Sequence, residues 1–218
     1  MISAGLSPVP SQLPLSSAVP LSYRLPRRLT QLYLGLMLYG LSMALIIASA
    51  LGNMPWDVLH QGGSKQSGLT IGTVAAIVGL LVLLAWIPLR ERPGLGTISN
   101  VIVISIAVDL SLNLLPIPGP LPVRIGYAGV GILLNGVATA AYIGAALGSG
   151  PRDGLMTGIV ARTGGSVRLI RTGIEITVVA IGWALGGTLG FSTAAYALLI
   201  GPLVQLFLPR LAVARPKT

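Results

Sequence analysis

The acidic residues of this chain are few, and their positions carry its strongest chemical signal. Among 218 residues there are five: Asp57, Glu91, Asp109, Asp153 and Glu175. Asp109 and Glu175 stand within long apolar runs, where a lipid-facing charge would cost roughly 2.5 to 3.5 kcal/mol at the bilayer centre. We therefore expect both to face protein or water. Arg171 stands one helical turn before Glu175, so Glu175 either forms an ion pair with Arg171 or serves a site for a proton or cationic solute.

Asp57 and Asp153 belong to two copies of one motif, LGNMPWD and LGSGPRD. An acid in the first turn of a helix is favoured by the macrodipole, and proline is tolerated there, so one interpretation is a short helix at the membrane surface. The alternative is that both segments are short or re-entrant helices from opposite faces, whose polar ends line a shared central site. Arg152 replaces Trp56 between proline and acid, so such a site would be asymmetric.

The two motifs are part of a longer internal repeat. Residues 96 positions apart match without a gap along most of the chain. The matched motif residues are Gly52 with Gly148, Pro55 with Pro151 and Thr97 with Thr193. One register held over so many positions predicts two copies of one unit. Small residues at intervals of four, from Gly40 and again from Gly136, predict helices that pack closely against others and against each other.

The composition indicates an integral membrane protein. Charged residues make up 9% of the chain and hydrophobic residues 53%, and the mean hydropathy is +0.86. The net charge of +9 comes from basic residues between apolar runs, which is typical of membrane-flanking anchors and disfavours nucleic-acid binding. The absence of cysteine and the single histidine, His60, argue against disulfides, thiolate catalysis and metal sites. No catalytic constellation or cofactor motif is present, so we expect neither an enzyme nor a cofactor.

The apolar runs predict an all-α membrane protein with six transmembrane helices in two inverted three-helix repeats. Each repeat has a short or re-entrant helix after its first span. The predicted boundaries are a disordered cytoplasmic tail at 1–28, repeats at 29–122 and 123–209, and a basic cytoplasmic tail at 210–218. This topology puts both termini inside and leaves only Lys65 and Arg124 outside among 14 basic residues, a strong positive-inside bias.

Several motifs make the sequence similar to a known family. The two Pro/Asp motifs, GLTIG at 68–72 and RTGIEITVVAIGWALGG at 171–187 resemble the YczE/YitT-like family of bacterial integral membrane proteins, within it the YczE subfamily. The likeness covers about residues 27–209. It implies a multi-pass protein of the bacterial plasma membrane.

The sequence favours a small secondary transporter or permease for an unknown small solute or ion. Its site would draw on the four acids Asp57, Asp153, Asp109 and Glu175, with Arg171, Arg152 and Trp56 beside them. The alternative is a non-transporting membrane protein that assists or regulates a partner complex. A membrane partner or a homo-oligomer is compatible with either function.

Overall fold

The computed structural model describes residues 22–116 and 118–213, which form eight α-helices and no strand. The helices are α1 (Leu25–Ser49), α2 (Pro55–Ser67), α3 (Ile71–Leu89), α4 (Leu95–Leu114), α5 (Leu121–Gly144), α6 (Pro151–Thr163), α7 (Val167–Ala184) and α8 (Phe191–Leu211). Most of the predicted tail at 1–28 and the last residues of the basic tail lie outside the described part. However, α1 begins at Leu25, so the end of the predicted tail is helical.

The internal repeat is a repeat of four helices. Each of α5 to α8 begins 96 residues after its counterpart among α1 to α4. The second helix of each half, α2 or α6, has 13 residues and begins with the motif proline. Both Pro/Asp segments are therefore short helices, as the proline and the first-turn acid predict.

Five of the described helices are long and apolar enough to cross a membrane: α1, α3, α4, α5 and α8. The predicted fifth span, α7, is not among them. It has 18 residues, but three of them are charged, Arg168, Arg171 and Glu175 in its first half, more than the other five contain in a membrane-length window. The protein is a multi-pass membrane protein, and α7 carries the most charged residues of its long helices.

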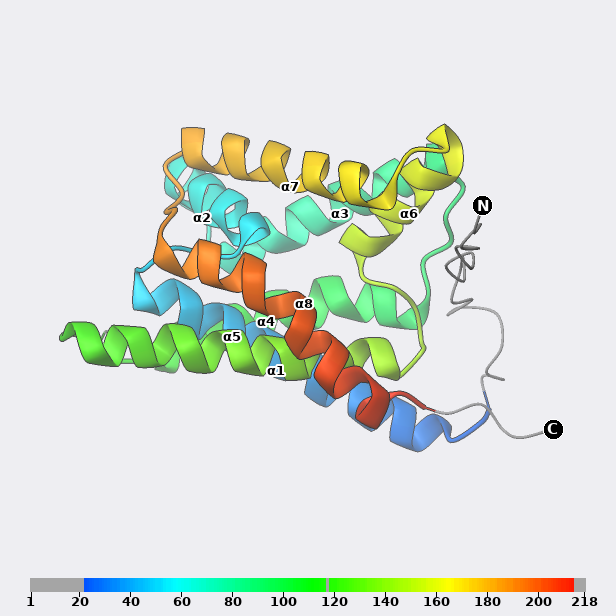
Figure 1. The fold of residues 1–218 in the computed structure, drawn as a ribbon, viewed down its shortest axis with the longest axis horizontal. Coiled ribbons are helices and arrows are strands. Elements are labelled where there is room, and N and C mark those ends of the chain that lie inside the picture. The colour runs from blue at the N-terminus through cyan, green and yellow to red at the C-terminus, as the bar shows by residue number, and fades with distance from the viewer. Residues whose placement is uncertain (1–21, 117, 214–218) are drawn as a thin grey trace, which may run out of the picture.

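The helices form two layers, and each half of the chain contributes to both. Figure 1 shows α1, α4, α5 and α8 in one layer and α2, α3, α6 and α7 in the other. Within the second layer, α2 packs on α7 and α6 packs on α3, so each short helix lies against a helix of the other half. The halves are thus interlocked and do not form separate domains.

The helices α1 and α5 run antiparallel through the first layer, and arginines join their ends. Arg28 near the start of α1 donates hydrogen bonds to carbonyl oxygens at the end of α5, from Nε to Ala145 (2.8 Å) and from Nη2 to Ala146 (2.7 Å). Arg124, its counterpart in the repeat, donates in the same way to Ser49 (2.7 Å) and Ala50 (2.8 Å) at the end of α1. Because a helix C-terminus leaves carbonyls unpaired, each arginine caps the other half's first helix.

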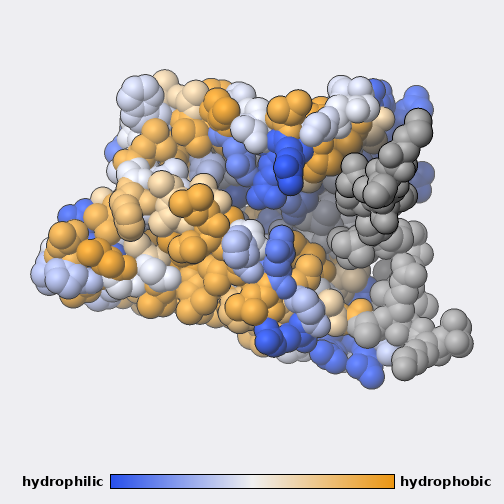
Figure 2. Space-filling view, viewed as in Figure 1, coloured by the Kyte–Doolittle hydropathy of each residue, from blue (hydrophilic) through white to orange (hydrophobic). Residues whose placement is uncertain are grey.

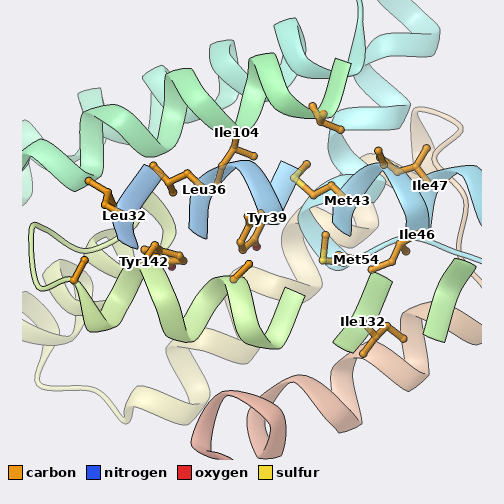
Figure 3. Close-up of a cluster of buried hydrophobic side chains, with 14 of the residues drawn as sticks. Leu32, Leu36, Tyr39, Met43, Ile46, Ile47, Met54, Ile104, Ile132 and Tyr142 are labelled. Atoms are coloured by element: carbon orange, nitrogen blue, oxygen red, sulfur yellow. The ribbon is translucent and has the colours of Figure 1, made fainter. Parts of the chain in front are cut away.

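Small residues let α1 and α5 pack closely, but at Gly35 and Gly131, whereas the predicted Gly40 and Gly136 face Ala107 of α4 and Leu203 of α8. A Cβ atom built on Gly35 would lie 3.0 Å from the backbone nitrogen of Tyr142, and one on Gly131 would lie 2.6 Å from the Ile46 side chain. The hydrophobic core surrounds this contact. Figure 3 shows side chains of α1, among them Leu36, between neighbouring helices.

Apolar side chains cover much of the outer surface. Exposed leucines and isoleucines lie on α3, α4, α7 and α8, for example Leu169 and Leu198, each 75% exposed. In Figure 2 most of the visible face is hydrophobic, while hydrophilic side chains gather near the middle of α7 and toward the molecule's ends. Such a surface suits lipid.

Candidate functional site

A cavity of about 380 Å³ lies between the two layers and is lined by residues of both halves. Its polar and charged lining residues are His60, Asn100, Ser105, Thr139, Arg152, Asp153, Arg171, Glu175 and Gln205, and its aromatic lining residues are Tyr39, Trp56, Tyr142 and Tyr196. This size fits a small solute.

The N-termini of α2 and α6 meet at this cavity, since Pro55 and Trp56 of one and Pro151 and Arg152 of the other line it. The turns before these helices are anchored to the last helix of the opposite half. Gly52 has φ 111° and lies so near Gly190 that a Cβ atom would come within 2.5 Å of its nitrogen. Only glycine combines this left-handed backbone with so close an approach.

The counterpart turn at Gly148, with φ 135°, lies against Thr97 in the same way. The Thr97 hydroxyl donates to the Ser149 carbonyl at 2.7 Å and accepts from the Gly94 N–H at 3.1 Å. Thr193 likewise accepts from the Gly190 N–H at 3.2 Å. The repeated Gly and Thr residues therefore hold the two short helices in position, and none of the four lines the cavity.

Arg152 joins the two short helices across the cavity. Its guanidinium carbon lies 4.8 Å from the centre of the Trp56 ring, a cation–π contact, and its Nη2 lies 3.9 Å from Asp57 Oδ1. The Arg152 side chain is 32% exposed, whereas that of Asp57 is fully buried. Arg152, which stands where the first motif copy has Trp56, thus links the two copies.

Asp57 also contacts His60, whose Nδ1 lies 3.2 Å from Asp57 Oδ1. Burial lowers the pKa of His60, although the hydrogen bond to Asp57 opposes this shift. The neutral imidazole that follows can donate its Nδ1 hydrogen to the carboxylate. Asp57 is therefore held between His60, one turn further along α2, and Arg152 of α6.

Asp153, the counterpart of Asp57, faces the cavity and accepts a hydrogen bond from the Tyr142 hydroxyl at 3.2 Å. Burial raises the pKa of Asp153, and the Tyr142 hydrogen bond and the charge of Arg152 oppose that rise. A carboxyl in this position can exchange a proton as well as bind a cationic group.

Arg171 and Glu175 line the cavity from α7, and Arg171 Nε donates to Glu175 Oε1 at 3.1 Å. The predicted ion pair is confirmed. It is also accessible, with 61% of the Arg171 side chain and 40% of the Glu175 side chain exposed. The ion pair, one of the two alternatives for Glu175, is therefore present. Because Glu175 also lines the cavity, contact with a solute stays the second alternative.

Asp109 lies apart from the other three acids and does not line the cavity. Its Oδ1 accepts from the Gly72 N–H at 2.7 Å, and its Oδ2 accepts from the Thr70 hydroxyl at 2.6 Å. These are the contacts of a residue that caps the start of α3. The expectation that Asp109 joins the shared site is thus not supported by its position. Its repeat counterpart, Gln205, lines the cavity instead.

The sequence analysis did not select the tyrosines that line the cavity. Tyr39 and Tyr142 are in edge-to-face contact with ring centres 6.2 Å apart. Tyr196 donates to Asn135 Oδ1 at 3.0 Å, and Asn135 Nδ2 donates to the Ser42 hydroxyl at 2.8 Å. Their positions within apolar runs could have indicated them, since a tyrosine hydroxyl buried there needs a hydrogen-bond partner.

Within the described residues, no group of three or more His, Asp or Glu side chains could hold a metal ion.

Comparison with known proteins identifies relatives over nearly the whole helical part. Residues 26–209 match a family of unknown function, DUF6198. A protein of Haemophilus influenzae named "Uncharacterized protein" is 41% identical over 177 residues, covering 81% of each chain. The "Uncharacterized membrane protein YczE" of Bacillus subtilis is 33% identical over 185 residues, covering 84% of this chain and 86% of its own.

A third relative, "Uncharacterized protein YyaS" of Bacillus subtilis, is 28% identical over 181 residues. No solved structure matches. The similarity to YczE confirms the resemblance that the two Pro/Asp motifs indicated. The chain therefore belongs to the DUF6198 family of unknown function, with the membrane protein YczE among its relatives.

Proposed function

We propose that the protein is a small secondary transporter whose solute site is the central cavity. The observation that carries this proposal is the meeting of the α2 and α6 N-termini, one from each half, at a cavity with charged side chains. In transporters with internal repeats, solutes bind at the repeat interface, where half-helix N-termini point at anionic groups. Arg152 would meet such a group, while Asp153 and Glu175 would meet a cationic one.

We further propose that the two halves are inverted three-span repeats, with α7 as the sixth span and α2 and α6 as re-entrant helices. The antiparallel packing of α1 against α5 and the reciprocal arginine caps support the inversion. The length of α7 and its packing against α2 support the sixth span.

The orientation follows from the same topology. Gln31 at the start of α1 donates to the carbonyl of Leu211 at the end of α8 (2.8 Å), so the two described ends lie together. The positive-inside rule would place that end in the cytoplasm of a bacterial plasma membrane.

A ligand screen followed by a flux assay tests the proposal. Purified protein and an Arg152→Gln variant are screened by thermal shift against a library of small charged metabolites. Compounds that stabilise the parent protein but not the variant are then tested for uptake into proteoliposomes. We expect at least one compound that binds and is taken up. Binding without uptake of any compound would favour the regulatory alternative, and absence of binding would contradict the site.

A further inference from the structure

The two halves of the chain differ where the third and fourth helices of each half meet. In the first half, α3 packs along α4 through two glycines. A Cβ atom on Gly79 would lie 3.1 Å from the Val101 side chain, and one on Gly72 would overlap the Ser105 carbonyl oxygen. The counterpart helices α7 and α8 have no comparable packing between them, and they diverge from the turn that joins them (Figure 1).

The sequence accounts for this difference. The small residues of α3 on the face toward α4, at positions 72, 75 and 79, correspond to three charged residues of α7: Arg168, Arg171 and Glu175. Long charged side chains cannot lie against a neighbouring backbone as glycine does. The side chains of Arg171 and Glu175 instead remain substantially exposed. A gap between α7 and α8 is therefore encoded in the second half of the chain alone.

This gap opens the central cavity toward lipid. From the α8 side the cavity is lined by three exposed residues at intervals of four: Ala197, Gly201 and Gln205. The side chains that flank the gap are apolar and exposed, such as Leu198 on α8 and Ile176 on α7. In Figure 2 hydrophilic side chains lie between the hydrophobic surfaces of the two layers. The cavity thus has a lateral opening whose borders suit lipid.

An apolar groove of about 310 Å³ on α7 adjoins the cavity, because Glu175 and Pro55 line both. Apart from Thr172, the other residues of this α7 groove are apolar: Ile176, Val179, Ala180, Trp183 and Leu189. From Glu175 to Trp183 the groove follows the helix for about 12 Å, at 1.5 Å per residue. A charged cavity and an apolar groove therefore meet at Glu175.

The cavity offers both signs of charge to a ligand. Arg152 donates no hydrogen bond within the described part of the chain, since its nearest carboxylate, Asp57, is 3.9 Å away. Glu175 accepts from Arg171 through Oε1, which leaves its Oε2 available within the same described part. A purely anionic ligand would face Glu175 and a purely cationic one Arg152, and like charges repel. A head group with both charges fits this lining.

We infer that the solute of the central cavity is a zwitterionic amphiphile. Its head group enters through the opening between α7 and α8 and binds among Arg152, Arg171 and Glu175, while its alkyl chain lies in the α7 groove. A charged group is costly in lipid and an alkyl chain in a polar cavity, so the division of the site matches the two parts of the ligand. The inference rests on the proposed function in taking the cavity as the solute site, and it adds the class of solute and its route of entry.

Thermal unfolding of the purified full-length chain in neutral maltoside micelles tests the inference. Three probes are compared at equal concentration: lysophosphatidylethanolamine, glycerophosphoethanolamine, which has the same head group without the chain, and monoacylglycerol, which has the same chain without the charges. We expect lysophosphatidylethanolamine to raise Tm by at least about 3 °C, because a ligand that binds only the folded state stabilises it. Neither of the other probes should do so.

Variants locate the two parts of the ligand. Arg152→Gln should lose most of the rise because it removes the cation that meets the head group. Ala180→Phe should also lose it, because the added ring fills the α7 groove. The matched control is Ala184→Phe, since Ala184 is exposed one turn further along α7 and lines neither the cavity nor the groove. Should Arg152→Gln not fold, the two phenylalanine variants decide.

Four results would overturn the inference. An equal rise with glycerophosphoethanolamine would show that the cavity takes a soluble solute, which leaves the proposed function standing. An equal rise with monoacylglycerol would show that only the apolar chain is bound. An equal rise in both phenylalanine variants would place the chain outside the α7 groove. No rise with any probe would exclude this class of solute, whereas uptake of a compound without an alkyl chain would still support the proposed function.

Discussion

Replacing Arg28 with methionine should destabilise the protein by about 3 kcal/mol, because two backbone carbonyls lose their hydrogen-bond donor. The Arg28 side chain is 1% exposed, and its guanidinium donates to Ala145 and Ala146 at 2.8 and 2.7 Å. An unsatisfied buried acceptor costs about 1 to 3 kcal/mol. Because the bond to Ala146 is only part-buried, we take about 1.5 kcal/mol for each carbonyl, in the lower half of that range, which gives the total. Methionine keeps most of the aliphatic volume, so the loss reports on the polar contacts of the guanidinium, the cap among them.

The matched control is Arg124→Met in the other half. Its acceptors are a part-buried carbonyl of Ser49 and an exposed carbonyl of Ala50, to which water has access. We therefore expect a loss of about 1 kcal/mol, smaller than for Arg28→Met. The free energy of unfolding of each variant is measured in mixed micelles. Equal losses, or a larger loss for Arg124→Met, would refute the reasoning that each arginine stabilises the protein according to the burial of the carbonyls it caps.

Three further predictions concern packing and charge. Gly154→Ala should cost roughly 2 kcal/mol or more in unfolding free energy, because its Cβ would overlap the Trp86 ring, whereas Gly126→Ala, with nothing within 4 Å, should not lower stability. Because burial raises the pKa of Asp153 above the ordinary 3.8, the folded state binds the extra proton, so melting temperature should fall as pH rises from about 4 to 7, and Asp153→Asn should abolish this fall. Glu175→Gln removes one partner of the pair with Arg171 at the cavity and should impair solute uptake in a variant that still folds; a stable variant with full uptake would exclude Glu175 from the site.

The helices and their repetition were predictable from the sequence because both depend on local patterns. Apolar runs, motif prolines and the constant spacing of 96 residues gave eight segments, and helices lie at all of them. The observed helix ends differ from the predicted ones where the residues at the helix terminus determine where the helix begins. For example, the first repeat was expected to start at residue 29, whereas α1 begins at Leu25, since Pro26 is tolerated in the first turn.

The composition of the cavity was only partly predictable. The contact between Arg152 and Trp56 depends on α2 packing on α7 and α6 on α3, and no helical periodicity contains that pairing. Asp109 was predicted to join the shared site because it lies deep in an apolar run. Its actual partner is the start of α3, 37 residues away, which sequence spacing does not reveal.

The claim that the cavity belongs to a transporter is tested most directly by its access to the two sides of the membrane. The chain has no cysteine, so single cysteines can be introduced without background. Ala197 lines the cavity, while the adjacent Leu198 is 75% exposed on the apolar outer surface of α8 and serves as the matched control. Membrane-impermeant thiol reagents are applied from either side of sealed vesicles. Alternating access predicts that Ala197→Cys reacts from both sides and Leu198→Cys from neither, whereas reaction of Ala197→Cys from one side only, or from neither, would contradict it.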